Sequence, residues 1–357
     1  MSIKLLSLFH AFGESDSKIL GSVEIINSQL IGTGACLPDF VLTNAMLEHM
    51  VDTNDEWIVQ RTGVRERRIA KNMHTWELAL GAAQDALADA KIDAGELDLI
   101  LVSTCTPDTN TPNTAAILQN KLGAGAIGAF DINNACTGFV SATDIADCYI
   151  KSGKAKTVLV VSAETLSRIV DYTDRGTCIL FGDGAAAAVL TNGEAGTPKR
   201  CLPSAPRLRD VRCGADGRQY PLLTVGGGTN RNYKPGDPVQ DDFYLQMQGR
   251  EVFKQAVRSL SAVCSELLED NGLTLEDIDL FIPHQANLRI IEAVGDRLKL
   301  ESEKIFVNLD EYGNTSAASI PLGIGDACAQ GRIRPGSRVL LSAFGGGFTW
   351  GAALLEF

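Results

Sequence analysis

The sequence predicts an α/β fold in which one structural unit occurs twice. Segments of helical periodicity alternate with short apolar runs, which is the pattern of a sheet covered by helices. The segment 98–161 also resembles the segment 279–342 in its order of acidic turn, strand, helix and strand. Two copies of one unit predict a pseudo-twofold core in which equivalent helix starts face one cleft, so that Cys136 and Asn314 occupy related places.

Length and composition limit the classes of protein that the chain can belong to. Its 357 residues exceed what one hydrophobic core usually serves, and 45% hydrophobic with 21% charged residues is typical of a soluble globular protein. A net charge of −12 argues against general nucleic-acid or membrane-surface binding. Nine cysteines without C-x-x-C spacing fit a reducing cytosol, and the four histidines form no metal-ligand cluster.

Three parts are expected along the chain. Residues 1–27 form an N-terminal extension whose short apolar run is followed by charges, so it neither spans a bilayer nor has a secretory cleavage pattern. Residues 28–200 form a first half that contains the candidate cysteine. Residues 201–357 form a second half that contains a histidine and an asparagine discussed below.

The regular elements follow in order from residue 30. A strand over 30–35 ends in glycines, which indicate a turn more than a nucleotide loop. The elements predicted after it are a helix over 75–91, a buried strand over 96–103, a helix that ends at Leu122 before Gly123, and a strand over 157–162.

Cys136 stands where a short apolar strand runs into a helix. Unpaired N–H groups and the positive dipole end of a helix favour thiolate over thiol, so this position is expected to lower the cysteine pKa and to supply donors for an oxyanion. Gly138 keeps the first turn narrow. The pattern therefore indicates a nucleophile, with a buried structural cysteine as the alternative.

His284 follows a buried strand, at the point where parallel sheets open into ligand crevices. The side-chain N–H groups of His284 and Asn314 could together stabilise an enolate or an oxyanion. A conventional Cys-His hydrolase remains open at this point.

A basic run over 55–68 contains Trp57 and Arg61 in an otherwise acidic chain. Guanidinium groups suit phosphates and a tryptophan offers a flat face to a purine, so the run fits a coenzyme A nucleotide. The alternative is a solvated charged loop with a packed tryptophan.

Five ordered motifs resemble β-ketoacyl-acyl-carrier-protein synthase III, a family of the thiolase superfamily. They are Asn134-Ala-Cys136-Thr-Gly, Phe181-Gly-Asp-Gly-Ala, Ile282-Pro-His284-Gln-Ala-Asn287-Leu-Arg, Tyr312-Gly-Asn314-Thr-Ser-Ala-Ala-Ser and Phe344-Gly-Gly-Gly-Phe-Thr-Trp-Gly. The likeness runs from about Leu30 to Phe357. It implies the five-layered α-β-α-β-α thiolase fold, a cytoplasmic homodimer, and the decarboxylating condensation of acyl-CoA with malonyl-acyl-carrier protein that initiates type II fatty acid synthesis.

The resemblance also implies catalytic roles. Cys136 corresponds to the acyl-accepting nucleophile, and His284 with Asn314 to the pair that supports decarboxylation. The N–H groups of Cys136 and Gly346 correspond to the oxyanion hole. No metal and no cofactor are implied, since the coenzyme A thioester is a substrate.

Binding roles follow in the same way. The resemblance implies an adenine-stacking pair (Trp57, Arg175), a coenzyme A phosphate contact (Arg61), a residue near the pantetheine channel (Asn287) and a basic landing site for an acidic carrier protein (Arg250, Lys254, Arg289). Thr111 stands where short-primer members carry a phenylalanine that reaches the partner's acyl tunnel. The smaller side chain predicts acceptance of primers longer than acetyl.

Two other functions remain possible from the sequence. A superfamily relative that primes a secondary metabolite, of alkylquinolone or polyketide type, would have the same three catalytic residues. A non-catalytic thioester-binding protein would not need the intact set of cysteine, histidine and asparagine. Thiolase itself is disfavoured, because the glycine run after Phe344 lacks a second cysteine.

Overall fold

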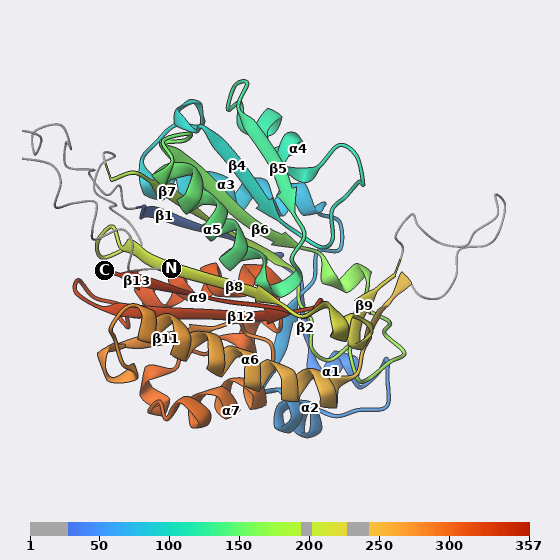
Figure 1. Ribbon diagram of the computed structural model, residues 1–357. Helices are drawn as coiled ribbons and strands as arrows, with labels where there is room; N and C mark the ends of the chain where they lie inside the picture. Colours follow the sequence, from blue (N-terminus) through green and yellow to red (C-terminus); the bar gives the residue numbers. More distant parts are fainter. Residues whose placement is uncertain (1–27, 194–201, 227–242) are drawn as a thin grey trace, which may run out of the picture.

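The computed structural model describes residues 28–193, 202–226 and 243–357, and Figure 1 shows their arrangement. The expected extension 1–27 and the expected boundary at residue 200 lie outside these ranges. In the described part of the chain, no helix is long and apolar enough to cross a membrane.

Strands from both halves form one hydrogen-bonded array. Within the described ranges its order is β11-β12-β13-β8-β1-β7-β6-β4-β5. The bounds are β1 Gln29–Cys36, β4 Leu99–Ser103, β5 Gly128–Ile132, β6 Thr157–Glu164, β7 Gly184–Thr191, β8 Arg207–Ala215, β11 Leu280–Pro283, β12 Arg338–Gly345 and β13 Thr349–Glu356. Two small ribbons pair β2 Val41–Thr43 with β3 Glu66–Arg68 and β9 Leu223–Val225 with β10 Leu245–Met247.

The helices divide into three layers and a few short connections. The long helices are α3 Thr75–Ala90, α4 Thr114–Leu122, α5 Gly138–Lys151, α6 Gly249–Asp270, α7 Leu288–Leu298 and α9 Ser319–Ala329. The shorter ones are α1 Asn44–Leu47, α2 Asp55–Thr62 and α8 Leu309–Tyr312.

The predicted repeat is confirmed by the strand order. In the first half β4 is parallel to β5 and β6, and β7 is antiparallel to β6 and β1. In the second half β11 is parallel to β12, and β13 is antiparallel to β12 and β8, with an isolated bridge at Ile305 in place of β5. The two copies begin in the same way. The Asp98 carboxylate accepts the N–H of Thr157, the first residue of β6, and the Asp279 carboxylate accepts the N–H of Arg338, the first residue of β12.

Alternate residues of the buried strands pack against different helix layers. In β4, Leu99 and Leu101 face a core shared with α5 and α9, whereas Ile100 and Val102 face a core shared with α3 and α4. Helices α6 and α7 cover the face of β11, β12 and β13 that lies opposite to α5 and α9 (Figure 1). The order is therefore α-β-α-β-α, and strands covered on both faces explain the continuous apolar runs in the sequence.

The element boundaries follow local capping chemistry. Helix α3 ends before Lys91 and α4 ends before Gly123, and both of these residues have positive φ, at 56° and 70°. The strand predicted over 96–103 is shorter than expected. Residues 94–96 form a 3₁₀ turn and β4 begins at Leu99, since the backbone and the carboxylate of Asp98 both bond to Thr157 before the ladder starts.

Candidate active site

One cavity of about 1330 Å³ gathers most of the residues singled out in the sequence. Both halves of the fold contribute to its walls, together with α2 and the start of α6. The predicted residues that line it are Trp57, Arg61, Cys136, Arg250, Lys254, His284, Asn287, Arg289, Asn314 and Gly346. Two predicted residues, Arg175 and Thr111, are not part of its lining.

Cys136 lies on the 3₁₀ turn Ala135–Thr137, which continues into α5. The end of β12 approaches this turn so closely that a Cβ on Gly345 would lie 2.7 Å from the Cys136 nitrogen. Gly346 follows and also lines the cavity. The turn and the glycine run therefore meet around the N–H groups that the sequence assigned to an oxyanion hole.

The prediction that the helix start lowers the pKa of Cys136 is wrong. Burial raises the pKa of this thiol to about 11. The Ser316 side chain and the Cys136 backbone lower the pKa, but they offset only part of the effect of burial. The carboxyl group of Glu164 raises it further. Cys136 is reached through the cavity but is otherwise enclosed by protein, and it stands two residues before α5 begins, so desolvation outweighs the helix dipole.

His284 follows β11 directly, and only 4% of its surface is exposed. Its Nδ1 lies 2.7 Å from the Ser319 Oγ, and the same Oγ accepts the Gln285 N–H at 3.2 Å. Burial lowers the histidine pKa to about 3, so the ring is neutral at physiological pH. The Ser319 hydroxyl hydrogen is not used by the Gln285 bond and is available to Nδ1; when it donates there, the imidazole proton lies on Nε2.

Asn314 is fixed by one hydrogen bond of its backbone and one of its side chain. Its backbone N–H donates to the Leu180 oxygen at 2.8 Å, and its Oδ1 accepts the Ser316 N–H at 2.9 Å. Since Oδ1 is engaged by the backbone, the side-chain NH₂ group is the end left to donate to a ligand.

Cys136 and Asn314 lie in related segments but not at equivalent positions. The first strands β4 and β11, the two 3₁₀ turns and the strands β6 and β12 match with an offset of 181 residues, which is the separation of Asp98 and Asp279. Ala135 and Ser316, which begin the two 3₁₀ turns, match in this register, and both have positive φ, at 45° and 53°. The counterpart of Cys136 is therefore Ala317, which corrects the equivalence expected from the sequence.

Trp57 on α2 has two guanidinium groups near its ring. Arg175 lies 5.0 Å and Arg61 5.6 Å from the ring centroid. Arg175 also donates to the Asp52 oxygen at 3.0 Å. Asn287 caps α7 and donates to the Arg61 oxygen at 3.1 Å, so it links α7 to α2 at the cavity wall.

Three basic residues of the lining, Arg250, Lys254 and Arg289, are exposed to solvent. Lys254 pairs with Glu251 at 2.8 Å, and the Arg289 guanidinium lies 6.0 Å from the Phe253 ring. This local positive group stands out against the acidic net charge of the whole chain.

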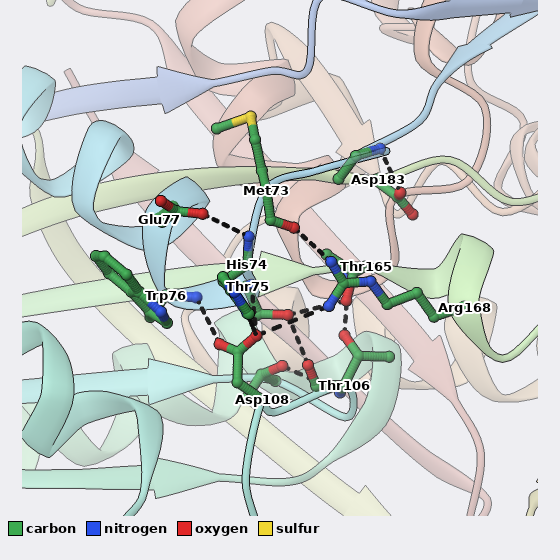
Figure 2. A network of polar contacts seen from close by, with 12 residues as sticks. Met73, His74, Thr75, Trp76, Glu77, Thr106, Asp108, Thr165, Arg168 and Asp183 are labelled. Atoms are coloured by element: carbon green, nitrogen blue, oxygen red, sulfur yellow. Dashed lines mark hydrogen bonds and ion pairs between the residues drawn. The ribbon is translucent and has the colours of Figure 1, made fainter.

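Thr111 is exposed on the loop between β4 and α4. The base of that loop is fixed by the network in Figure 2, in which Asp108 accepts the N–H groups of Thr75 and Trp76 at the start of α3. The Thr75 hydroxyl in turn donates to the Thr106 oxygen at 2.7 Å. The loop is thus anchored to α3, and Thr111 is not part of the cavity lining, although its neighbour Asn110 is.

Three residues near the cavity were missed in the sequence. Ser319 orients His284, Cys105 lines the cavity, and Glu164 ends β6 with a buried carboxyl group. The available indication for Glu164 was a charged residue that ends an apolar strand. Nothing in the local sequence distinguished Ser319 from an ordinary small helix residue.

Two family profiles match the chain. "3-Oxoacyl-[acyl-carrier-protein (ACP)] synthase III" matches residues 130–205, and "3-Oxoacyl-[acyl-carrier-protein (ACP)] synthase III C terminal" matches residues 268–357. A curated relative, the beta-ketoacyl-[acyl-carrier-protein] synthase III of Nitratidesulfovibrio vulgaris (strain DP4), is 54% identical over 331 residues, which cover 92% of this chain and 99% of that protein.

Solved structures agree with these matches. The 3-oxoacyl-[acyl-carrier-protein] synthase III of Aquifex aeolicus VF5 superposes with a TM-score of 0.84 at 47% identity, covering 92% of this chain and 100% of that one. The priming beta-ketosynthase of the R1128 polyketide pathway also gives a TM-score of 0.84, at 34% identity, over 94% of this chain and 98% of that one.

Proposed function

This chain belongs to the β-ketoacyl-acyl-carrier-protein synthase III family, and we propose that it condenses an acyl group from acyl-CoA with malonyl-acyl-carrier protein. The enzyme is an acyltransferase of the condensing type that initiates fatty acid synthesis. The products are β-ketoacyl-acyl-carrier protein, coenzyme A and carbon dioxide.

The observation that carries the proposal is the shared cavity, in which a thiol from one half faces neutral hydrogen-bond donors from the other. In the first step Cys136 attacks the thioester carbonyl, and the N–H groups of Cys136 and Gly346 bind the oxyanion until coenzyme A leaves. The acyl group then remains on Cys136.

Decarboxylation follows on the second substrate. As the malonyl group loses carbon dioxide, His284 and Asn314 donate hydrogen bonds to the thioester oxygen, where enolate charge develops. A neutral imidazole suits this step, and the lowered pKa of His284 supports it. The carbanion equivalent attacks the acyl-Cys136 carbonyl, and the thiolate leaves.

The substrates are proposed to bind to residues in and around the cavity. The proposed coenzyme A site consists of Trp57 and Arg175 at the adenine, Arg61 at the phosphates and Asn287 near the pantetheine channel. The exposed group Arg250, Lys254 and Arg289 is proposed to dock the acidic carrier protein. A cytoplasmic homodimer that needs no metal and no cofactor completes the proposal.

Priming of a polyketide is the second candidate, because one structure with a TM-score of 0.84 has that role. The higher identity to fatty acid synthesis enzymes, 54% against 34%, favours the first candidate. The acceptor distinguishes the two: transfer to the malonyl group of a fatty acid carrier protein supports the first, and transfer only to a polyketide carrier protein supports the second.

Mass spectrometry on the intact protein tests the proposal in two stages. After mixing with acyl-CoA, the chain should gain one acyl mass, on the peptide that contains Cys136. Addition of malonyl-acyl-carrier protein should remove this mass and release carbon dioxide with β-ketoacyl-acyl-carrier protein. An adduct that never forms would contradict the enzyme and favour a thioester-binding protein.

A further inference from the structure

A carboxyl group that the proposed reaction does not use lies at the end of β6. Glu164 has no exposed surface. It accepts hydrogen bonds from the Thr106 hydroxyl at 2.6 Å and the Cys105 N–H at 3.2 Å, and the Cys105 thiol lies 3.4 Å away. These partners are neutral, and within the described residues no cation pairs with the buried carboxyl group to hold it ionised.

Ser316 lies between this carboxyl group and the nucleophile. The turn Ser316–Ala318 packs against both β6 and the turn that carries Cys136. The repeat supports this position independently. In the 181-residue register, Gly345 matches Glu164 and Ala135 matches Ser316. Gly345 approaches Ala135 so closely that a Cβ on Gly345 would lie 3.3 Å from the Ala135 Cβ. The symmetry-related contact between the two copies is that of Glu164 with Ser316, in agreement with the packing of the Ser316–Ala318 turn against β6.

The Ser316 hydroxyl is free for a further role. Only 1% of the residue is exposed, it lines the cavity, and its Oγ has no hydrogen bond of normal geometry. It is nevertheless close enough to Cys136 and to Glu164 to lower the pKa of both. A buried hydroxyl without a hydrogen-bond partner costs stability, and Ser316 can offer its hydroxyl to Cys136 and Glu164 without breaking another hydrogen bond.

The first step of the proposed reaction needs such a group. Burial raises the pKa of Cys136 to about 11, while His284, at about 3, is a weak base. Burial raises the pKa of Glu164 to about 7, in part offset by the Thr106 hydroxyl, so this carboxyl group can take up and release a proton near neutral pH. The titratable groups that face it are the thiols of Cys105 and Cys136.

We propose that Glu164 accepts the proton of the Cys136 thiol through the Ser316 hydroxyl during acyl transfer. This inference rests on the proposed function. As the sulfur attacks the thioester carbonyl, its proton passes to the Ser316 Oγ while the Ser316 hydroxyl proton passes to the Glu164 carboxylate. The bond from the carbonyl carbon to the coenzyme A sulfur breaks, and Glu164 returns the proton, which neutralises the departing thiolate.

The test is the rate of coenzyme A release in a single turnover with excess enzyme, measured from pH 5.5 to 9 with acyl-CoA alone. Because the carboxylate form is the acceptor, the parent rate should fall about tenfold per pH unit below a midpoint near 7. Glu164→Gln should lose this midpoint, and its rate at pH 8 should be lower by roughly a hundredfold.

Two further variants separate a proton relay from a structural role. Ser316→Ala keeps the carboxyl group but interrupts the path, and it should lose the midpoint as Glu164→Gln does. Thr106→Val removes a hydrogen bond that lowers the Glu164 pKa, so it should keep the midpoint but move it to higher pH. Glu164→Asp, which retains a carboxyl group, should recover part of the rate and the midpoint.

The outcomes distinguish this inference from the function on which it rests. A parent that forms no acyl-Cys136 refutes the proposed function, and the relay with it. A parent that is acylated, while Glu164→Gln and Ser316→Ala keep its rate and its midpoint, refutes the relay alone. Near-UV circular dichroism of each variant establishes that a loss of rate is not a loss of fold.

Discussion

The two halves of the molecule have the same backbone plan but carry different chemical groups at matching positions. At the 181-residue offset, the pair His284 and Ser319 of the second half matches Ser103 and Gly138 of the first. His284 has its ring held by the Ser319 hydroxyl, whereas a Cβ on Gly138 would lie 1.7 Å from the Ser103 Oγ. The first half is therefore closed where the second half holds an imidazole.

At the 3₁₀ turns it is the first half that carries the reactive side chain. There the first half presents the Cys136 thiol, and the second half has the methyl group of Ala317. Each half thus supplies what the other lacks: the nucleophile in the first, and neutral donors in the second. One cavity between two similar units can in this way separate acyl transfer from decarboxylation, and substitution of Cys136 should affect a different step from substitution of His284 or Asn314.

The largest effect is expected from Cys136→Ser in the first half. A serine hydroxyl is a far weaker acid than a thiol, so acyl transfer should fall by at least about three orders of magnitude. The fold should persist, because the change replaces sulfur by oxygen at a partly enclosed site. Intact-protein mass spectrometry after mixing with acyl-CoA measures the loss, and normal condensation by the variant would exclude Cys136 as the nucleophile.

The complementary effect is expected from the second half. His284→Ala and Asn314→Ala should each still become acylated, while malonyl decarboxylation falls by about two to three orders of magnitude, the usual result of removing one such donor. Release of carbon dioxide from malonyl-acyl-carrier protein measures this step. Either variant decarboxylating at the parent rate would show that the two halves do not divide the reaction.

The pH dependence of decarboxylation sharpens the same comparison. Burial lowers the pKa of His284 to about 3, below its ordinary value of 6.5, so the ring stays neutral as the pH rises from 5 to 8. The histidine should therefore add no titration to the decarboxylation rate in this range. By linkage its neutral form stabilises the fold above pH 6.5, and that contribution is lost as the pH falls towards 3.

Much of this organisation could be predicted from the sequence, because it depends on local patterns. Buried strands such as β4 are continuous apolar runs, helix ends such as Gly123 follow backbone sterics, and the repeat brings Cys136 and Asn314 into one cavity. The approximate match of these two residues was visible as well, since Cys136 follows Asp98 by 38 positions and Asn314 follows Asp279 by 35. The positive φ of Ala135 and of Ser316, together with the bounds of the 3₁₀ turns, then fixes the register.

The electrostatics of the site could not be predicted in the same way. The sequence placed Cys136 at a helix start, which favours thiolate, but the opposing desolvation depends on how completely distant segments enclose the sulfur. Glu164 and Ser319 were missed for the same reason. Their partners lie far away in the chain, at Thr106 for the carboxyl group and at His284 for the hydroxyl, so the local sequence shows Glu164 only as a charged residue at a strand end and does not mark Ser319.

A smaller effect is expected from Ser319→Ala, which removes the hydroxyl that holds His284. The loss of about one hydrogen bond, near 1 kcal/mol, should slow decarboxylation by roughly fivefold to tenfold and leave acylation unchanged. The histidine ¹⁵N chemical shifts should show a mixture of tautomers in place of the Nε2–H form.

Ser319→Thr keeps the hydroxyl and serves as the matched control for this change. It should retain the Nε2–H tautomer and most of the decarboxylation rate. If Ser319→Ala instead has the parent's tautomer and rate, then another group orients the imidazole, and the match of Ser319 with Gly138 has no catalytic consequence.

The halves also differ in the loop that follows the first matching strand. Residues 104–113 join β4 to α4, whereas residues 284–287 suffice between β11 and α7. The longer loop presents Thr111 on the surface, where it is not part of its own chain's cavity lining. In the proposed homodimer we expect this loop to reach the acyl tunnel of the partner subunit, as the family resemblance implies, where a threonine would leave space that a phenylalanine would fill.

Thr111→Phe is therefore expected to change primer selection without changing the chemistry of Cys136. Each buried methylene contributes about 0.8 kcal/mol, so the parent should prefer longer acyl-CoA substrates by roughly fourfold per accommodated methylene, and the variant should lose this preference. The measurement is kcat/KM across a series of acyl-CoA chain lengths. Thr111→Val, of nearly equal volume, should keep the parent profile. A parent that uses only acetyl-CoA, or a phenylalanine variant with the parent profile, would mean that the long loop of the first half does not set primer length.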